Sequence, residues 1–524
     1  MGKRKAEKYG GAVGGEKARG QAGMGAQGWQ AFLERIFFAP IGSAWLGAFR
    51  LLWGLCLTYE TCGYLSHHFA KLRSAVLTSH PVRYYALTWL PLCSLQSMQI
   101  ISCVLFGLSI CIALGFFSRT STALFALLFP WLAFYEASLY LNHIYLTAVI
   151  SLALACLPTG ASISLDSVLF PKISRQRYIS RWTLILLQGL LLIVYTHAGL
   201  AKINEDWLRG EPLRHWLPKR AHIYGPIMLQ ESLAYAMSYI GLVYDLVAVP
   251  LLMIPQTRTL GVLLNITFHC TNKLIFSIGI FPLIMCSALT IFFPPSQAEH
   301  AQASLERMVG TPLRVSHQKP KLKGRITVKQ GIVILLLCTF LAGQALYPLR
   351  HYMYEGDVAW NEYGHLLSWR MKLRDKTCNA KRVFLRDPET GAKSNGMRAL
   401  ERLYSTRQRR TAWSRPDQLA QMAHTLADSF TNRTSGVRPE VHMDIVCQLN
   451  FRPLAQFTDP KQDMAGWPAF QWPYPWLMPE PKLPAHLEAD YPWNFEWTFS
   501  WLTTFPECHF RDNHELLGVD RNVY

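Results

Sequence analysis

Residues 195–217 read YTHAGLAKINEDWLRGEPLRHWL, and this stretch decides how the chain is interpreted. It begins inside an apolar helical run and leaves that run through Lys202, after which charged and aromatic residues follow at once. Placing an ionisable group at the end of a buried helix costs free energy, so such a group is a candidate for function. The competing interpretation is a lysine whose stem lies along apolar surface while its ammonium reaches the lipid headgroups.

The composition indicates a membrane protein. Only 16% of the 524 residues are charged and 50% are hydrophobic, whereas a soluble domain carries about 25% charge. The apolar residues gather in runs near the length of about 20 residues that a helix needs to cross a hydrocarbon core. We therefore predict a polytopic α-helical membrane protein with about nine transmembrane helices, at 42–66, 98–117, 120–140, 143–158, 181–203, 233–254, 257–273, 278–293 and 328–349.

The net charge of +18 is unevenly distributed along the chain. Lysine and arginine concentrate in the N-terminal tail, in the loop 159–180 and in the loop 294–327. With an odd number of spans these three segments fall on one side, as the positive-inside rule requires for the cytoplasmic face. The charge thus predicts a topology and not a nucleic-acid partner. It places the N-terminus in the cytoplasm, and residues 204–232 and the C-terminal region outside it.

Three parts are expected along the chain. They are a disordered basic cytoplasmic tail at 1–28, a transmembrane helical domain at 29–350 and an extracytoplasmic β-rich domain at 351–524. The tail lacks the apolar core of a signal peptide. Within the last part, short apolar segments separated by turn residues predict strands at 366–373, 381–386 and 441–451. Residues 398–429 have the apolar spacing of a helix.

Further polar residues occur in or beside the predicted spans. They are Asn142, His143, His197, His269, Asn272 and Lys273. Polar groups in a membrane need partners, so the set can either line one cavity or make separate interhelical hydrogen bonds. The segment 361–374 can cover such a cavity, although an interfacial belt of aromatic and basic residues has the same composition. Most cysteines lie within predicted helices, and no spacing typical of metal ligands occurs, so we predict no metal.

Five blocks of the sequence resemble one known family. They are 199–217, LNHIYL at 141–146, FHCTNKLIFSIGIFP at 268–282, GHLLSWRMKL at 364–373 and VHMDIVCQLNFRPLAQFTDP at 441–460. Together, and in this order, they are similar to the vitamin K-dependent gamma-glutamyl carboxylases and to bacterial relatives with a related transmembrane domain. The resemblance covers most of the chain.

The resemblance implies a reaction. In the family, vitamin K hydroquinone is deprotonated and reacts with O2, and the resulting strong base removes a γ-proton from a glutamyl residue, whose carbanion captures CO2. Lys202 then matches the base that deprotonates the quinol, a task that needs an unprotonated amine. His143 beside Asn142 matches the histidine of the oxygenation chemistry. The remaining expected pocket residues are His197, Arg214, His215, Trp216, His269 and Asn272. The expected partners are membrane lipid, the quinone and a Glu-containing protein or peptide.

The chain also departs from the animal enzymes. Their longer C-terminal part has no counterpart here, and Thr425 stands where the cysteine of their bridge to the first lumenal loop is expected. Both features favour a bacterial homologue in a cytoplasmic (inner) membrane. One alternative is quinol oxygenation with a different acceptor or none. Another is a non-catalytic transporter or lipid-binding protein, although the internal repeats frequent in transporters are not seen.

Overall fold

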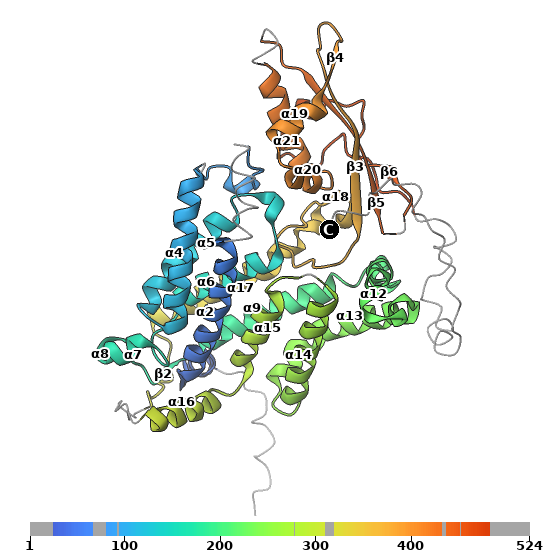
Figure 1. Ribbon diagram of the computed structural model, residues 1–524. Helices are drawn as coiled ribbons and strands as arrows, with labels where there is room; N and C mark the ends of the chain where they lie inside the picture. The colour runs from blue at the N-terminus through green and yellow to red at the C-terminus, as the bar shows by residue number, and fades with distance from the viewer. Residues whose placement is uncertain are drawn as a thin grey trace, which may run out of the picture.

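The fold was described from a computed structural model. It describes residues 25–65, 80–91, 94–276, 278–309, 319–431, 436–450 and 452–482. The described chain has a helical part and a smaller part with a sheet, which stands at one end of the helices (Figure 1). Most of the tail predicted to be disordered, residues 1–24, lies outside the described residues.

Every segment predicted to span the membrane contains a helix. These helices are α2 (Ala44–Leu65), α4 (Leu95–Leu114), α5 (Ser118–Ala133), α6 (Asn142–Ala155), α9 (Trp182–Leu200), α13 (Glu231–Met253), α14 (Arg258–Ile275), α15 (Phe281–Ala288) with η5 (Leu289–Phe292), and α17 (Val328–Leu346). Shorter helices connect them: η1 (Tyr85–Leu87), η2 (Ala137–Leu139), α10 (Glu205–Leu208), α11 (Leu213–Trp216), η3 (Pro218–Arg220), α12 (Ala221–Tyr224), η4 (Pro226–Leu229), η6 (Tyr347–Met353) and α18 (Val358–Asn361).

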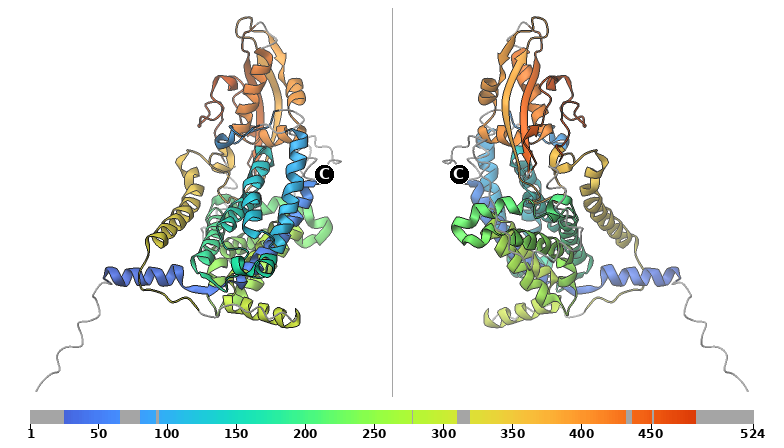
Figure 2. Two further views of the ribbon diagram at one scale, coloured as in Figure 1. Left: turned by 90° about the vertical axis from the view of Figure 1, so that its left-hand side faces the viewer. Right: turned by 90° about the vertical axis from the view of Figure 1, so that its right-hand side faces the viewer.

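Fewer than nine of these helices are long and apolar enough to cross a membrane. Within the described residues four helices are long and apolar enough to cross a membrane, at 95–114, 182–200, 231–253 and 328–353. A fifth results if the pair 281–292 and 295–304, bent by 96°, counts as one span. The nine predicted spans are therefore not confirmed, since α5 and α6 have only 16 and 14 residues. Figure 2 shows α17 leaning away from the other helices, and only 11% of its apolar window is buried.

The described parts of the basic loops 159–180 and 294–327 meet residues 26–42 at the end of the helical part that lies opposite the sheet (Figure 2). There β1 (Pro40–Gly42) pairs with β2 (Tyr178–Ser180), and Ser162 Oγ donates to Gln302 Oε1 at 2.6 Å. Glu34 accepts from the backbone N–H groups of Lys323 and Gly324 at 3.0 and 2.6 Å. The helices at this end are α1 (Ala26–Phe38), α7 (Leu165–Leu169), α8 (Pro171–Ser174) and α16 (Pro295–Val309), with α1 and α16 lying across the bundle (Figure 2). The two basic loops therefore lie at the same end of the helical part, and the basic tail at 1–24 lies outside the described residues.

The C-terminal part is an α+β unit rather than a β-rich one. Its four-stranded antiparallel sheet has the order β4-β3-β5-β6, with β3 (Lys376–Arg386), β4 (Lys393–Asn395), β5 (Glu440–Leu449) and β6 (Ala455–Gln456). The helices α19 (Gly396–Leu403), α20 (Thr406–Ala412) and α21 (Pro416–Thr431) cover one face of the sheet (Figure 1), and η7 (Met464–Gly466) follows β6. A disulfide, which was not predicted from the sequence, joins Cys378 of β3 to Cys447 of β5.

Two predicted strands of this unit are confirmed and a third is wrong. Strands occur within 381–386 and 441–451, whereas 366–373 forms turns. Leu367, Trp369 and Lys372 have φ of 58°, 59° and 52°, a backbone conformation incompatible with a strand. The helix predicted at 398–429 is divided into three, because Ser405 forms a capping box and Pro416 starts the next helix.

Candidate functional site

A cavity of about 1380 Å³ lies between the helical part and the segment 365–376. It is larger than the range of about 300–1,000 Å³ that is usual for small-molecule sites. Most of its lining is apolar and comes from α9, α13, α14 and the residues after α14. Polar lining residues include Lys202, Asn142, His143, His269 and Asn272, so with Trp216 the structure brings six of the predicted site residues into one cavity.

The end of α9 positions Lys202. The backbone N–H of Lys202 donates to the carbonyl of Gly199 at 2.9 Å, and Asn204 caps the next helix, α10, by accepting from Trp207 N at 2.9 Å. The lysine side chain returns along α9, where Nζ donates to the carbonyl of Ala198 at 3.2 Å. Nζ also lies 5.2 Å from the centroid of the Trp207 ring, whose Nε1 donates to Ser238 of α13 at 2.9 Å. Trp207 is thereby fixed against the lysine.

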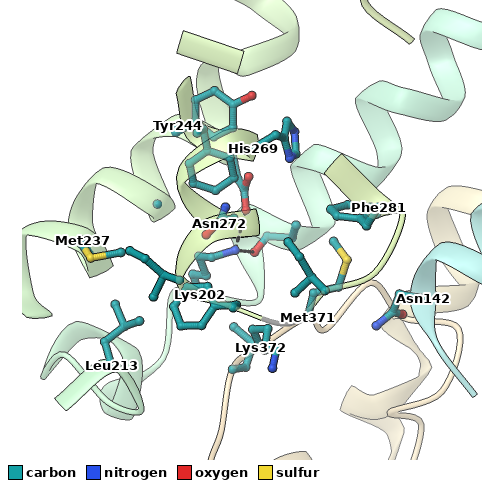
Figure 3. Close-up of a pocket in the computed structure, with 18 of the residues that line it drawn as sticks. Asn142, Lys202, Leu213, Met237, Tyr244, His269, Asn272, Phe281, Met371 and Lys372 are labelled. Atoms are coloured by element: carbon teal, nitrogen blue, oxygen red, sulfur yellow. Dashed lines mark hydrogen bonds and ion pairs between the residues drawn. The ribbon is translucent and has the colours of Figure 1, made fainter. Parts of the chain in front are cut away.

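Lys202 has an acidic partner on α13. Its Nζ lies 2.5 Å from Asp245 Oδ2, and the two residues are only 6% and 5% exposed. This contact requires α9 and α13 to lie close together. A Cβ at Gly199 would come within 3.2 Å of Leu246 N and 2.6 Å of Leu246 Cδ2, so this glycine of the GLAK sequence permits the approach. In Figure 3, Lys202 lies among the labelled residues with Tyr244 and His269 on one side and Met371 and Lys372 on another.

The opposite wall carries Asn142 and His143 at the start of α6. Asn142 Oδ1 accepts from Tyr140 Oη at 2.9 Å, and Tyr140 Oη in turn accepts from Leu367 N at 2.9 Å. The loop after α14 turns at Gly279, which has a φ of 59° and lies against His143, since a Cβ there would be 3.6 Å from the His143 ring. The side chain of Asn142 therefore has a fixed direction, and the loop holds His143 at the cavity wall.

His269 belongs to a hydrogen-bonded group in the core of the helices. Its Nε2 lies 2.8 Å from Tyr195 Oη, which accepts from Asn265 Nδ2 at 2.8 Å. His269 Nδ1 and Asn265 Oδ1 are buried and have no hydrogen-bond partner within the described chain. Buried polar groups normally have partners, and His269 lines the cavity, so its Nδ1 is consistent with a hydroxyl-bearing ligand or a water there.

The segment 365–376 forms a basic roof over the cavity. The charged residues that it contributes to the lining are Arg370, Lys372, Arg374, Asp375 and Lys376. Lys376 donates to the carbonyls of Trp360 and Ser414 at 2.5 and 3.0 Å, and burial lowers its pKa to about 7 although Glu362 opposes the shift. Burial also lowers the pKa of Arg370 and of Lys372. Trp369, 2% exposed, packs on Tyr145 at 4.9 Å, so this segment covers the cavity and is no exposed interfacial belt.

Some of the residues that line the cavity are also exposed. Ile240 and Val243 of α13 line it and are nevertheless 63% and 54% exposed. Leu264 of α14 also lines the cavity and is also exposed. These exposed apolar residues place one side of the cavity close to the surface of α13 and α14.

Four predicted pocket residues remain to be placed. Three of them do not line the cavity, and the fourth, Trp216, does. His197 faces α17, where its Nε2 lies 2.9 Å from the carbonyl of Ala345. Arg214 pairs with Glu231 at the start of α13. His215 lies 4.0 Å from Asp375 in the roof, and burial lowers its pKa. Trp216 lines the cavity, with Lys372 Nζ 5.1 Å from its ring.

Asp245 belongs to the site but was not predicted from the sequence. An acidic residue within the apolar run 233–254 is rare in a membrane helix and is a candidate for function for the same reason as Lys202. That signal was present in the sequence. The sequence did not show that Asp245 pairs with Lys202, because the two residues are 43 positions apart.

The fold and the site define a membrane protein with a mostly apolar cavity roofed by a small α+β unit. Two family models match the chain: the HTTM domain at residues 38–296 and the vitamin K-dependent gamma-carboxylase lumenal domain at residues 329–482. The first covers most of the cavity's helices and the second covers its roof. The chain belongs to the vitamin K-dependent gamma-carboxylase family. The second match also fits an extracytoplasmic C-terminal region. No solved structure matches the chain.

Proposed function

We propose that this protein is a vitamin K-dependent carboxylase-like enzyme. It couples the epoxidation of vitamin K hydroquinone by O2 to the γ-carboxylation of a glutamyl residue with CO2. The observation that carries the proposal is the buried pair of Lys202 and Asp245 in a mostly apolar cavity. Membership of the vitamin K-dependent gamma-carboxylase family supports this choice of reaction.

The residues of the cavity fit a prenylated quinol. The apolar walls suit a long isoprenoid tail, for which we propose a side opening beside the exposed Val243, and the polar groups near Lys202 and Asn142 suit the hydroxyls of the ring. When bound, the quinol supplies, together with O2, the strong base that carboxylation needs. Quinone recognition by His143, Asn272 and His269 is part of the same proposal.

The protein's own groups have three tasks in this proposal. Lys202 Nζ accepts a hydroxyl proton of the ligand, and the Trp207 ring beside it restricts access of water. Arg370 and Lys372 in the roof, which make no ion pair within 4 Å among the described residues, give the extracytoplasmic end of the cavity a positive charge. A positive entrance attracts an anionic partner, here the side chain of a glutamyl residue in a protein or peptide.

The topology is part of the proposal. The basic end of the helices faces the cytoplasm, and the cavity roof and the sheet lie outside it. The disulfide between Cys378 and Cys447 supports this orientation, because disulfides persist in oxidising compartments such as the bacterial periplasm. A bacterial cytoplasmic membrane is the expected location.

One incubation tests the proposal. The purified full chain in lipid nanodiscs receives vitamin K hydroquinone, O2, labelled CO2 and a Glu-containing peptide, and epoxide and peptide label are measured separately. We expect both products. Epoxide without label would replace the proposal by quinol oxygenation with a different acceptor or none, and the absence of both products would refute it in favour of a non-catalytic membrane protein.

The base is tested by substitution. Lys202→Ala is expected to abolish epoxide formation while the protein still inserts in the membrane. Lys329→Ala, at an exposed lysine near the start of α17, is the matched control and should leave the rate unchanged. Full epoxidation by the Lys202 variant would exclude this amine as the base.

A further inference from the structure

The contacts of Lys202 in the structure favour its protonated form, which cannot act as a base. Within the described chain, Nζ contacts Asp245 Oδ2 at 2.5 Å, the carbonyl of Ala198 at 3.2 Å and the face of the Trp207 ring. All three favour an ammonium, because two are acceptors and the third is the negative face of an aromatic ring. An ammonium has no lone pair and cannot accept a proton. The group that the proposed function uses as base must therefore pass a proton on.

Asp245 is placed to receive that proton. Its Oδ2 is at hydrogen-bond distance from Nζ, and both residues are removed from water. Two charges in a dry site carry a large desolvation cost. Transfer of one proton from Nζ to Oδ2 converts the ion pair into a neutral amine and a neutral carboxylic acid, which lowers that cost. The free-energy difference between the neutral pair and the ion pair is therefore smaller in the cavity than in water.

We propose that Asp245 is a positioning residue that holds the proton released when the quinol is deprotonated. An N–H proton of Lys202 moves to Asp245 Oδ2, and the quinol O–H proton moves to Lys202 Nζ. The site then contains a quinol monoanion beside an ammonium and a neutral Asp245, and no electron is transferred in this step. The inference rests on the proposed function, since it assumes that a quinol is deprotonated here.

Other groups near the pair do not replace Asp245. The titratable groups that face it are Tyr244 on α13, Tyr195 on α9 and His269 on α14, together with Lys372 in the roof. Tyr195 already contacts His269 and Asn265, and Lys372 is a cation. Glu60 and Asp375 also line the cavity, but Asp245 is the acid that contacts Lys202 in the described chain.

Infrared difference spectroscopy tests the proton position without turnover. Vitamin K hydroquinone is added under argon, so that no epoxide can form. The wild-type protein is expected to gain the carbonyl band of a protonated carboxylic acid, and Asp245→Asn should lack this band. Lys202→Met should lack it as well, because without the amine Asp245 is already protonated before the quinol is added and gains no further proton. A wild-type spectrum without the band, or the same band in Asp245→Asn, would overturn the inference.

Kinetics provide the second readout. Proton transfer by a positioned group contributes about 10²–10⁴ to a rate, so Asp245→Asn should lower the epoxidation kcat at least about 100-fold at neutral pH. The residual rate should rise tenfold per pH unit as the quinol ionises by itself, whereas the wild-type rate stays flat. Asp245→Glu should restore part of the rate.

The control is Asp428→Asn, which removes an exposed acid of α21 and should leave the rate unchanged. An Asp245→Asn rate within about threefold of wild type would overturn the inference while the proposed function stands, because the wild-type protein would still form epoxide. A wild-type protein without epoxide would instead refute the proposed function.

Discussion

The loop that carries Trp207 is held in place by the C-terminal unit through Asp206. Asp206 Oδ2 accepts from Asn450 Nδ2 at 2.5 Å and from Arg452 Nη1 at 2.6 Å, and all three residues are buried. Hydrogen bonds to a charged group contribute about 1.5–3 kcal/mol each. Arg452 keeps a second acid, Glu480, at 2.8 Å. We therefore expect Asp206→Asn to destabilise the docked loop by about 3 kcal/mol, at the low end of the sum of two such bonds.

Hydrogen–deuterium exchange measures this change locally. A loss of about 3 kcal/mol raises the population of the open loop about 100-fold, since 1.4 kcal/mol corresponds to a factor of ten. The backbone amides of 204–217 should then exchange about 100-fold faster, while those of β3 and β5 keep their protection.

The pair of Arg438 and Asp428 supplies the control. It has a distance of 3.1 Å but is exposed, and exposed pairs contribute about 0–1 kcal/mol. Asp428→Asn should leave exchange in 204–217 unchanged. Exchange in the Asp206 variant within threefold of wild type would refute the claim that the C-terminal unit fixes the loop over Lys202.

Three further predictions follow from the geometry. Burial raises the pKa of Glu211 to about 8 from its usual 4.5, so the folded state binds the extra proton between these pH values and stability falls as the pH rises through them. Glu211→Gln should melt like wild type at pH 5 and be more stable at pH 8.5 by a few kcal/mol (about 1.4 per pKa unit); equal melting at both pH values would contradict this. Val243→Trp should narrow the side opening and raise the KM for vitamin K hydroquinone tenfold or more, but not that for a naphthoquinol without a prenyl tail. Leu263→Trp, at an exposed position that does not line the cavity, should change neither KM, and an equal effect of both substitutions would exclude this opening. A membrane-impermeant thiol reagent should label Glu389→Cys and not Ser304→Cys in intact cells, and the reverse pattern would invert the topology.

The helices of the membrane part were predictable because each lies in a run that is mostly apolar, even where polar residues interrupt it, as in α14. The number of crossings was not, because a run such as α6 is only 14 residues long and its depth depends on its neighbours. The same limit applies to α2, which carries Arg50. Its guanidinium is buried and donates to the carbonyls of Ile112 and Ala113 near the end of α4 at 2.8 and 3.1 Å. That tertiary contact satisfies a charge that hydropathy counts as polar.

The roof of the cavity was mispredicted for a different reason. LLSWRMKL at 366–373 has the apolar content of a strand, but it packs Trp369 against Tyr145 and directs Arg370 to the cavity. Left-handed backbone at Leu367, Trp369 and Lys372 makes this possible. Non-glycine residues adopt such angles only where tertiary contacts favour them, so no local pattern announces them.

The polar set of the site was predicted well where the chain itself fixes the position. Lys202 follows the last turn of α9, and Asn142 and His143 open α6, so their place at the helix ends was readable. His197 was assigned to the same cavity, although five residues along a helix turn a side chain away by about 140°. The structure places it against α17.

The pairing of Lys202 with Asp245 determines both where the lysine amine lies and where it can pass a proton. A lone ammonium at this depth would be drawn to the headgroups, as long basic side chains near helix ends usually are. The carboxylate of Asp245 removes the net charge from the cavity, and Gly199 allows α13 close enough for the contact. The same contact that retains the amine in the cavity also gives it an acceptor for a proton. Asp245→Asn should therefore impair both roles, and Lys202→Met should leave a buried acid that binds a proton and loses its charge.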